Sequence, residues 1–192
     1  MTTPAKQEHR MTARSTSRSP ASTSPTGTSP TGTSRSRTYS WADPAALARA
    51  GAGLSGLELI RKFASGELPP PPIIAMLEGS IVEVDEGRVV FMLTPTEWMF
   101  NPIGSVHGGI AATILDSCMG CAVHTVLTPG TGYTTGDLHI RYLRAMTTET
   151  GPVLAEGKVV HAGRRQATAE GRLFVQSTGK LIATGDTACV IL

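Results

Sequence analysis

The chain has 192 residues and a formal net charge of +2, from 17 basic and 15 acidic side chains, and it contains three cysteines. Three cysteines cannot build a disulfide framework in a chain of this length, so we expect a reducing compartment, the cytoplasm. No apolar run approaches the roughly 20 residues of a membrane-spanning helix. The N-terminal residues also lack the apolar core of a secretory signal, so we expect neither feature.

Residues 1–40 differ in composition from the rest of the chain. They hold six basic residues and one acidic residue, a net charge of +5, which leaves 11 basic and 14 acidic residues, a net charge of −3, for residues 41–192. Nineteen of the 40 residues are Ser or Thr, and only six belong to the hydrophobic set. Such a segment cannot bury enough apolar surface to offset the entropy lost on ordering. We therefore predict a disordered basic tail over 1–40 and a folded domain over 41–192.

The tail has three possible explanations. Its basic residues are scattered and accompanied by one aromatic residue, Tyr39, which argues against a nucleic-acid-binding arm. A composition rich in Arg and Ser fits an organelle-targeting segment, although prolines and glycines interrupt any amphipathic helix. A start site placed too far upstream would also explain it.

A helical region is predicted after the tail. Asp43 followed by Pro44 is typical of a helix start, with a capping carboxylate and a proline at the first helical position. Four apolar residues then recur at three-residue spacing along one helix face: Leu54, Leu57, Ile60 and Phe63. The proline run 69–72 is predicted to end this region, because proline lacks the backbone donor that a helix requires.

Two strands and a long helix are predicted next. The segments 81–84 and 89–93 are rich in strand-forming residues and flank an acidic turn at 85–87. Residues 106–127 then combine small and apolar residues in one continuous stretch. A helix that is apolar almost all round must be wrapped by other elements.

The last third of the chain predicts four strands with short links that contain Gly or Pro: 134–144, 153–161, 165–176 and 181–191. Consecutive strands with short links favour an antiparallel meander. The complete order is helix, two strands, long helix, four strands. We therefore predict an α+β domain whose strands wrap the long helix.

The candidate site lies where the long helix begins. Gly108 and Gly109 stand at the predicted helix start, and glycine allows a ligand or another backbone to approach closely. The first amides of a helix are unpaired and lie at its electropositive end, so they can hold a developing oxyanion. Alternatively, the two glycines only relieve crowding.

Asp116 is a lone carboxylate among apolar neighbours in the same helix. Because a buried carboxylate is costly unless paired, either it is satisfied by nearby hydroxyls or amides, or it acts as a general base or nucleophile. Eight residues, about 12 Å of helix, separate it from Gly108, so the two cannot touch one carbonyl group. If both serve one reaction, two copies of the helix must run antiparallel. This geometry predicts at least a homodimer.

The element order, together with Asn101, His107-Gly108 and Asp116, resembles the hotdog-fold acyl-CoA thioesterases of the phenylacetate-degradation (PaaI-like) family over residues 54–192. The resemblance implies a hotdog fold: a six-stranded antiparallel sheet wrapped around a long central helix, with an N-terminal helix. It also implies hydrolysis of an acyl- or aryl-CoA thioester to the free acid and CoA. The enzyme would be a dimer or a dimer-of-dimers tetramer, with no cofactor and no metal.

The resemblance also implies roles for individual residues. Asp116 would attack the thioester or activate water, and the Gly108 amide of the partner chain would polarise the thioester carbonyl. Asn101 would position the water or the carboxylate. His107 would orient the loop and hydrogen-bond near the thioester.

The family also places a Ser or Thr just before the strand that follows the long helix. Thr134 and Thr135 compete for this role, and Thr135 is preferred because it stands two residues before Asp137. The regions that would contact CoA are 142–146 and 162–166. The candidate CoA-binding residues within them are Arg144, Gly163, Arg164 and Arg165. Guanidinium groups suit phosphate, although these arginines can also be solvated strand ends.

Other residues and functions have simpler expectations. Cys118 and Cys121 are predicted to pack in the core rather than bind zinc, because no second cysteine pair accompanies them. His139 is predicted to face solvent. The functional alternatives are a non-catalytic acyl-CoA-binding or sensor protein on the same fold and, third, hydration of an enoyl thioester. Beyond acyl-CoA and a second copy of the chain, no nucleic-acid or membrane partner is expected.

Overall fold

The computed structural model describes residues 34–192, so most of the predicted tail, residues 1–33, lies outside the described residues. The helices and strands follow in this order: α1 (Pro44–Gly51), α2 (Gly56–Ser65), α3 (Pro72–Leu77), β1 (Ser80–Asp85), β2 (Arg88–Leu93), the 3-10 turn η1 (Glu97–Met99), α4 (Gly108–Thr125), β3 (Tyr133–Tyr142), the 3-10 turn η2 (Thr148–Thr150), β4 (Val153–Ala162), β5 (Gln166–Val175) and β6 (Leu181–Ile191). Among these described helices, none has the length and apolar character needed to cross a membrane.

The helical region before β1 is divided into three helices. Asp43 caps α1 by accepting a hydrogen bond from the Ala45 amide, as its sequence position predicts. A new cap at Ser55, which exchanges hydrogen bonds with Glu58, starts α2. The prediction that the proline run ends the helical region is wrong at its last residue. Pro72 opens α3, at a position where the missing amide donor carries no penalty.

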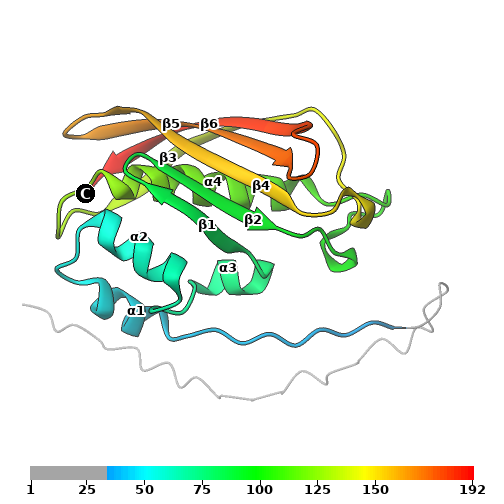
Figure 1. The fold of residues 1–192 in the computed structure, drawn as a ribbon, viewed down its shortest axis with the longest axis horizontal. Helices are drawn as coiled ribbons and strands as arrows, with labels where there is room; N and C mark the ends of the chain where they lie inside the picture. Colours follow the sequence, from blue (N-terminus) through cyan, green and yellow to red (C-terminus); the bar gives the residue numbers. More distant parts are fainter. Residues whose placement is uncertain (1–33) are drawn as a thin grey trace, which may run out of the picture. The chain divides into compact units, whose positions relative to one another are not determined.

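The six strands form one antiparallel sheet in the order β1-β2-β4-β5-β6-β3 (Figure 1). The predicted antiparallel meander holds for β4, β5 and β6, but β3 pairs with β6 instead of β4. The link between β3 and β4 spans residues 143–152 and includes η2, which is enough chain to reach the other end of the sheet. As a result β3 is an edge strand, and its second edge has no partner strand within residues 34–192.

Helix α4 is the element around which the sheet wraps, in agreement with the prediction of a six-stranded sheet around a long central helix. Its fully buried side chains, such as Ile114, Leu115 and Met119, belong to the hydrophobic core. Figure 1 shows α4 passing along the inner face of the strands, with α2 and α3 on its other side. Cys118 is fully buried here, as predicted for core packing.

A row of three glycines lets α4 approach the sheet. Gly157, Gly171 and Gly185 are paired with one another across β4, β5 and β6. A Cβ atom on Gly157 would lie 2.3 Å from the carbonyl oxygen of Cys118, closer than two such atoms can approach. The backbone of α4 therefore occupies the space that a side chain at this row would need.

We expect Gly157→Ala to destabilise the fold strongly, because the atom that obstructs the new methyl group is backbone and α4 must shift to admit it. Overpacking of this kind costs about 3 kcal/mol of unfolding free energy. Urea unfolding monitored by circular dichroism would measure the loss. Gly132→Ala is the matched control, since a Cβ there meets Leu192 at an ordinary 3.8 Å. Equal midpoints for the two variants would contradict the close approach.

Candidate active site

Asp116 lies half-buried on α4, on the side that faces β3. The Thr135 hydroxyl donates a hydrogen bond of 2.9 Å to Asp116 Oδ1. Thr135, and not its competitor Thr134, is thus the threonine that contacts this carboxylate. No hydrogen bond from the described residues reaches Asp116 Oδ2, so the second oxygen remains available to a ligand.

A β-bulge in β3 aims Thr135 at Asp116. The pairing of β3 with β6 shifts register between Thr135 and Asp137, which leaves Gly136 as the extra residue. Side chains alternate along a strand, so a regular β3 could not direct both Thr135 and Leu138 toward α4, whereas a bulge can. Asp137 secures the bulge by accepting a hydrogen bond of 2.8 Å from the Ala188 amide. The bulge depends on pairing with β6, so the sequence alone did not reveal it.

The start of α4 presents one free amide. His107 is the N-cap residue, and its Nδ1 accepts a hydrogen bond of 2.9 Å from the Gly109 amide. The Ile110 amide bonds the His107 carbonyl oxygen. The Gly108 amide has no partner among the described residues, whereas its carbonyl oxygen accepts a hydrogen bond from the Tyr142 hydroxyl. His107 therefore shapes the helix start so that the Gly108 donor stays unpaired.

Asn101 belongs to the loop before α4. Its side-chain amide donates to the Ser105 hydroxyl, and its side-chain oxygen accepts from the Ile103 amide. These bonds close the loop that leads to His107. Within one chain, Asn101 therefore lies with the helix start and not with Asp116.

The predicted catalytic residues thus fall into two groups within one chain. Asp116 and Thr135 line a cavity of about 490 Å³. Gly108 lines a different cavity, of about 340 Å³, together with Tyr142 and Arg144. The two groups are separated along α4, as the helix rise requires.

The candidate CoA-binding residues are also separated. Arg144 donates a hydrogen bond to the Leu181 carbonyl oxygen, near the start of β6. Arg164 and Arg165 are exposed in the β4–β5 hairpin, where the Gly163 amide bonds the Gln166 carbonyl oxygen. The Arg165 carbonyl bonds Ile191 at the far end of β6, roughly 30 Å of strand away. One chain does not bring these arginines to a single site.

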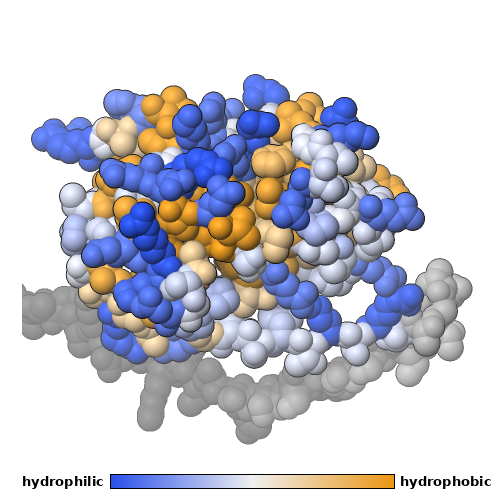
Figure 2. Space-filling model, viewed as in Figure 1, coloured by the Kyte–Doolittle hydropathy of each residue, from blue (hydrophilic) through white to orange (hydrophobic). Residues whose placement is uncertain are grey.

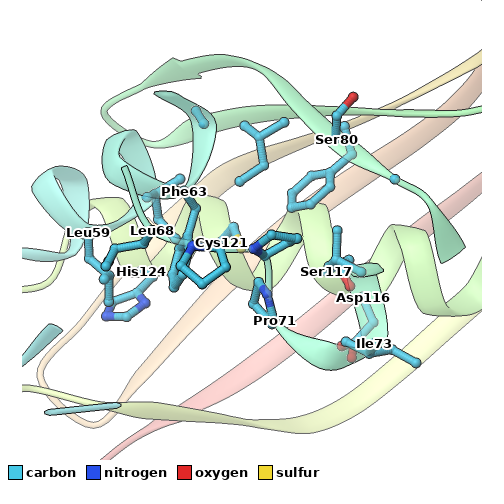
Figure 3. A pocket seen from close by; sticks show the side chains of 18 of the residues that line it. Leu59, Phe63, Leu68, Pro71, Ile73, Ser80, Asp116, Ser117, Cys121 and His124 are labelled. Carbon is cyan, nitrogen blue, oxygen red and sulfur yellow. The ribbon is translucent and has the colours of Figure 1, made fainter. Parts of the chain in front are cut away.

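The larger cavity lies between α4 and the helices that precede the sheet. Figure 3 shows its side chains, with Asp116 near one end and His124 near the other. Most of the lining is apolar and comes from α2, the proline run and α3. The sequence predicted a helical region here but not the element against which residues 54–78 pack, so this wall of the cavity was not predicted.

Burial keeps the other titratable groups of the cavity neutral. Burial lowers the pKa of His124, and it raises the pKa of Tyr133. Burial, with a smaller contribution from the negative charge of Asp116, raises the pKa of Cys121 to about 12. His124, Tyr133 and Cys121 are therefore uncharged near neutral pH. Over residues 34–192, no cluster of three or more His, Cys, Asp or Glu side chains is placed to hold a metal ion.

Comparisons with known proteins identify the family. The family model of the thioesterase superfamily matches residues 103–182. A solved structure of a thioesterase superfamily protein is 31% identical, with a TM-score of 0.59, and the match covers 71% of this chain and 98% of that one. The chain belongs to the thioesterase superfamily. This assignment confirms the predicted hotdog fold and reaction class, a thioester hydrolase.

Two further relatives of this thioesterase bear on which branch of the superfamily it resembles. A phenylacetic acid degradation-related thioesterase structure from Ralstonia eutropha JMP134 is 28% identical, with a TM-score of 0.62, over 68% of this chain and 98% of that one. A Halobacterium salinarum protein assigned as an esterase is 31% identical over 103 residues. That match covers 51% of this chain and 66% of the halobacterial protein. The PaaI-like resemblance is confirmed.

Proposed function

We propose that the protein hydrolyses acyl-CoA thioesters and that Asp116 is its nucleophile or general base. The observation that carries the proposal is the position of Asp116. It lies at the end of an apolar cavity, with one oxygen held by Thr135 and the other free. A carboxylate held in this way is oriented toward a group that enters the cavity.

The proposed reaction balances with water as the co-substrate. Asp116 takes a proton from water while the water oxygen bonds to the thioester carbonyl carbon, or the carboxylate itself forms this bond and water later releases the acid. The carbonyl oxygen becomes an oxyanion. The carbon–sulfur bond then breaks, and CoA leaves as the thiolate. It gains the proton that Asp116 took from water or, after direct attack, the proton that water gives up when it cleaves the anhydride. These steps call for no metal or organic cofactor.

We further propose that the oxyanion is held by Gly108 of a second chain. Helix α4 runs opposite to β3, because Gly108 contacts Tyr142 whereas Asp116 contacts Thr135. The free edge of β3 can pair with the same edge of another copy around a two-fold axis. Such pairing places Tyr142 of one copy opposite Thr135 of the other. It therefore places the free Gly108 amide beside Asp116.

The same arrangement would gather the separated arginines. Arg144 lies at the Tyr142 end of β3, and Arg165 lies at the Tyr133 end. In an antiparallel pair, Arg144 of one copy approaches Arg165 of the other. A CoA phosphate between them would be recognised by guanidinium groups from both chains.

An assay of thiol release from a panel of acyl- and aryl-CoA thioesters tests the proposed function. We expect free CoA and free acid to appear in equal amounts. Equilibrium binding of acyl-CoA without release of CoA would contradict hydrolysis and support the sensor alternative. Formation of a hydroxyacyl-CoA from an enoyl-CoA would instead show the hydration reaction.

A further inference from the structure

The shape of the cavity beside Asp116 bears on the acyl group that the enzyme accepts. Four residues of α4 line it, at positions that share one helix face: Asp116, Ser117, Cys121 and His124. From Asp116 to His124 is eight residues, or about 12 Å along the helix. Figure 3 shows Cys121 between these two ends. The cavity is therefore elongated along α4.

The wall opposite α4 is apolar along this whole length. Leu59, Phe63 and Leu68 lie toward the His124 end, and Ile73 lies toward Asp116 (Figure 3). Apolar surface also gathers on the outside of this region, over β1 and β2 toward α3 (Figure 2). Each methylene of a bound chain that this apolar wall removes from water makes binding more favourable.

The far end of the cavity is fixed by the contact between α2 and α4. The Gly56 amide donates a hydrogen bond of 3.1 Å to the Leu127 carbonyl oxygen, just beyond the end of α4. A Cβ on Gly56 would overlap the His124 carbonyl oxygen, at 1.7 Å. The Tyr133 ring packs edge-on against the His124 ring, with centroids 5.4 Å apart. Leu59 and His124 therefore form an end wall held by backbone contacts.

Resting on the proposed function, we infer that the enzyme selects medium-length linear acyl chains, of about eight to ten carbons, which extend along α4 from Asp116 to the end wall at Leu59 and His124. The length follows from the zigzag of an extended chain, in which bonds of about 1.5 Å advance the chain by about 1.25 Å each. Eight to ten carbons therefore span roughly 9 to 11 Å, which fits within the distance of about 12 Å between Asp116 and His124. Cys121 faces the middle of the bound chain, and its raised pKa makes it a neutral contact.

The dependence of kcat/KM on chain length, from acetyl-CoA to hexadecanoyl-CoA, tests this inference. We expect kcat/KM to rise about fourfold per methylene. The rise should stop at about eight to ten carbons, where the chain meets the end wall. A profile with no length dependence, or one that keeps rising to 16 carbons, would overturn the inference while leaving the proposed hydrolysis intact.

Two variants move the limit in opposite directions. Cys121→Phe fills the middle of the cavity, so kcat/KM for decanoyl-CoA should fall at least tenfold while butyryl-CoA changes less than about threefold. Leu59→Ala opens the end wall and should move the optimum to longer chains. Val82→Phe also introduces a phenyl ring, but at an exposed position on β1, and should leave the profile unchanged. A profile unchanged in Leu59→Ala would contradict the inference even if Cys121→Phe failed to fold.

A binding measurement separates this inference from the proposed reaction. Calorimetry with decanoyl-CoA and acetyl-CoA on the Asp116→Asn variant needs no turnover. Decanoyl-CoA should bind at least tenfold more tightly. If the wild-type protein hydrolysed no thioester but this preference held, the proposed function would fail and the acyl cavity would stand. Equal affinities would overturn the cavity assignment.

Discussion

Asp116→Asn is expected to lower kcat for acyl-CoA hydrolysis by about a thousandfold, within the range for loss of a general base or nucleophile. The change removes the charge but keeps the shape, and the amide oxygen can still accept the Thr135 hydrogen bond. The other ionisable groups of the cavity cannot replace the carboxylate: burial keeps Cys121 and Tyr133 protonated, and His124 lies at the opposite end of the cavity, about 12 Å along α4. Single-turnover measurement of CoA release would record the loss.

The control for this variant is Asp186→Asn. Asp186 is an exposed carboxylate on β6 that contacts His139 and Arg141 and does not line the cavity. Its replacement therefore removes one negative charge without changing the cavity. We expect its kcat to stay within twofold of wild type. Size-exclusion chromatography and thermal unfolding should be the same for both variants and wild type. Turnover by Asp116→Asn within threefold of wild type would remove Asp116 from the mechanism.

The elements whose positions could be predicted are those with a strong local pattern. Helix α4 begins at Gly108 and ends at Thr125, inside the predicted 106–127, because its apolar run is bounded by clear signals. The pairing of β3 with β6 could not be predicted, since strand order depends on where a long link crosses the sheet. The opening of α3 at Pro72 was missed because proline, which breaks the interior of a helix, is well tolerated at its first position.

As for the fold, the parts of the site that could be predicted are those with a strong local pattern in the sequence. Asp116 and Gly108 stand out because a lone carboxylate and paired glycines are unusual in an apolar helix, and the rise of a helix is sufficient to separate them. The contact of Thr135 depends on the bulge at Gly136, which is decided by pairing with β6. The acyl cavity depends on how α2 docks on α4 through Gly56. These are long-range contacts with no local signature. His139 is exposed, as predicted.

The Gly108 amide can be removed with little other change. Proline is tolerated at the first helical position, and His107 already has the extended backbone that proline requires of its predecessor, with φ −60° and ψ 135°. Gly108→Pro should lower kcat by about a hundredfold to a thousandfold, the usual effect of losing one oxyanion donor. Gly108→Ala is the matched control, because it keeps the amide and adds a similar contact, 3.2 Å from the Tyr142 ring. Equal losses in the two variants would assign the effect to crowding.

Mixing the two inactive variants decides whether the site spans two chains. In a random mixture of Asp116→Asn and Gly108→Pro chains, half of the dimers contain one of each, and one of their two sites combines an intact Asp116 with an intact Gly108. Co-refolding should therefore restore about a quarter of the wild-type activity. A site built within one chain would carry one defect in every copy, and the mixture would stay inactive. If the two chains pair antiparallel, the mixture must therefore recover activity that neither variant shows alone.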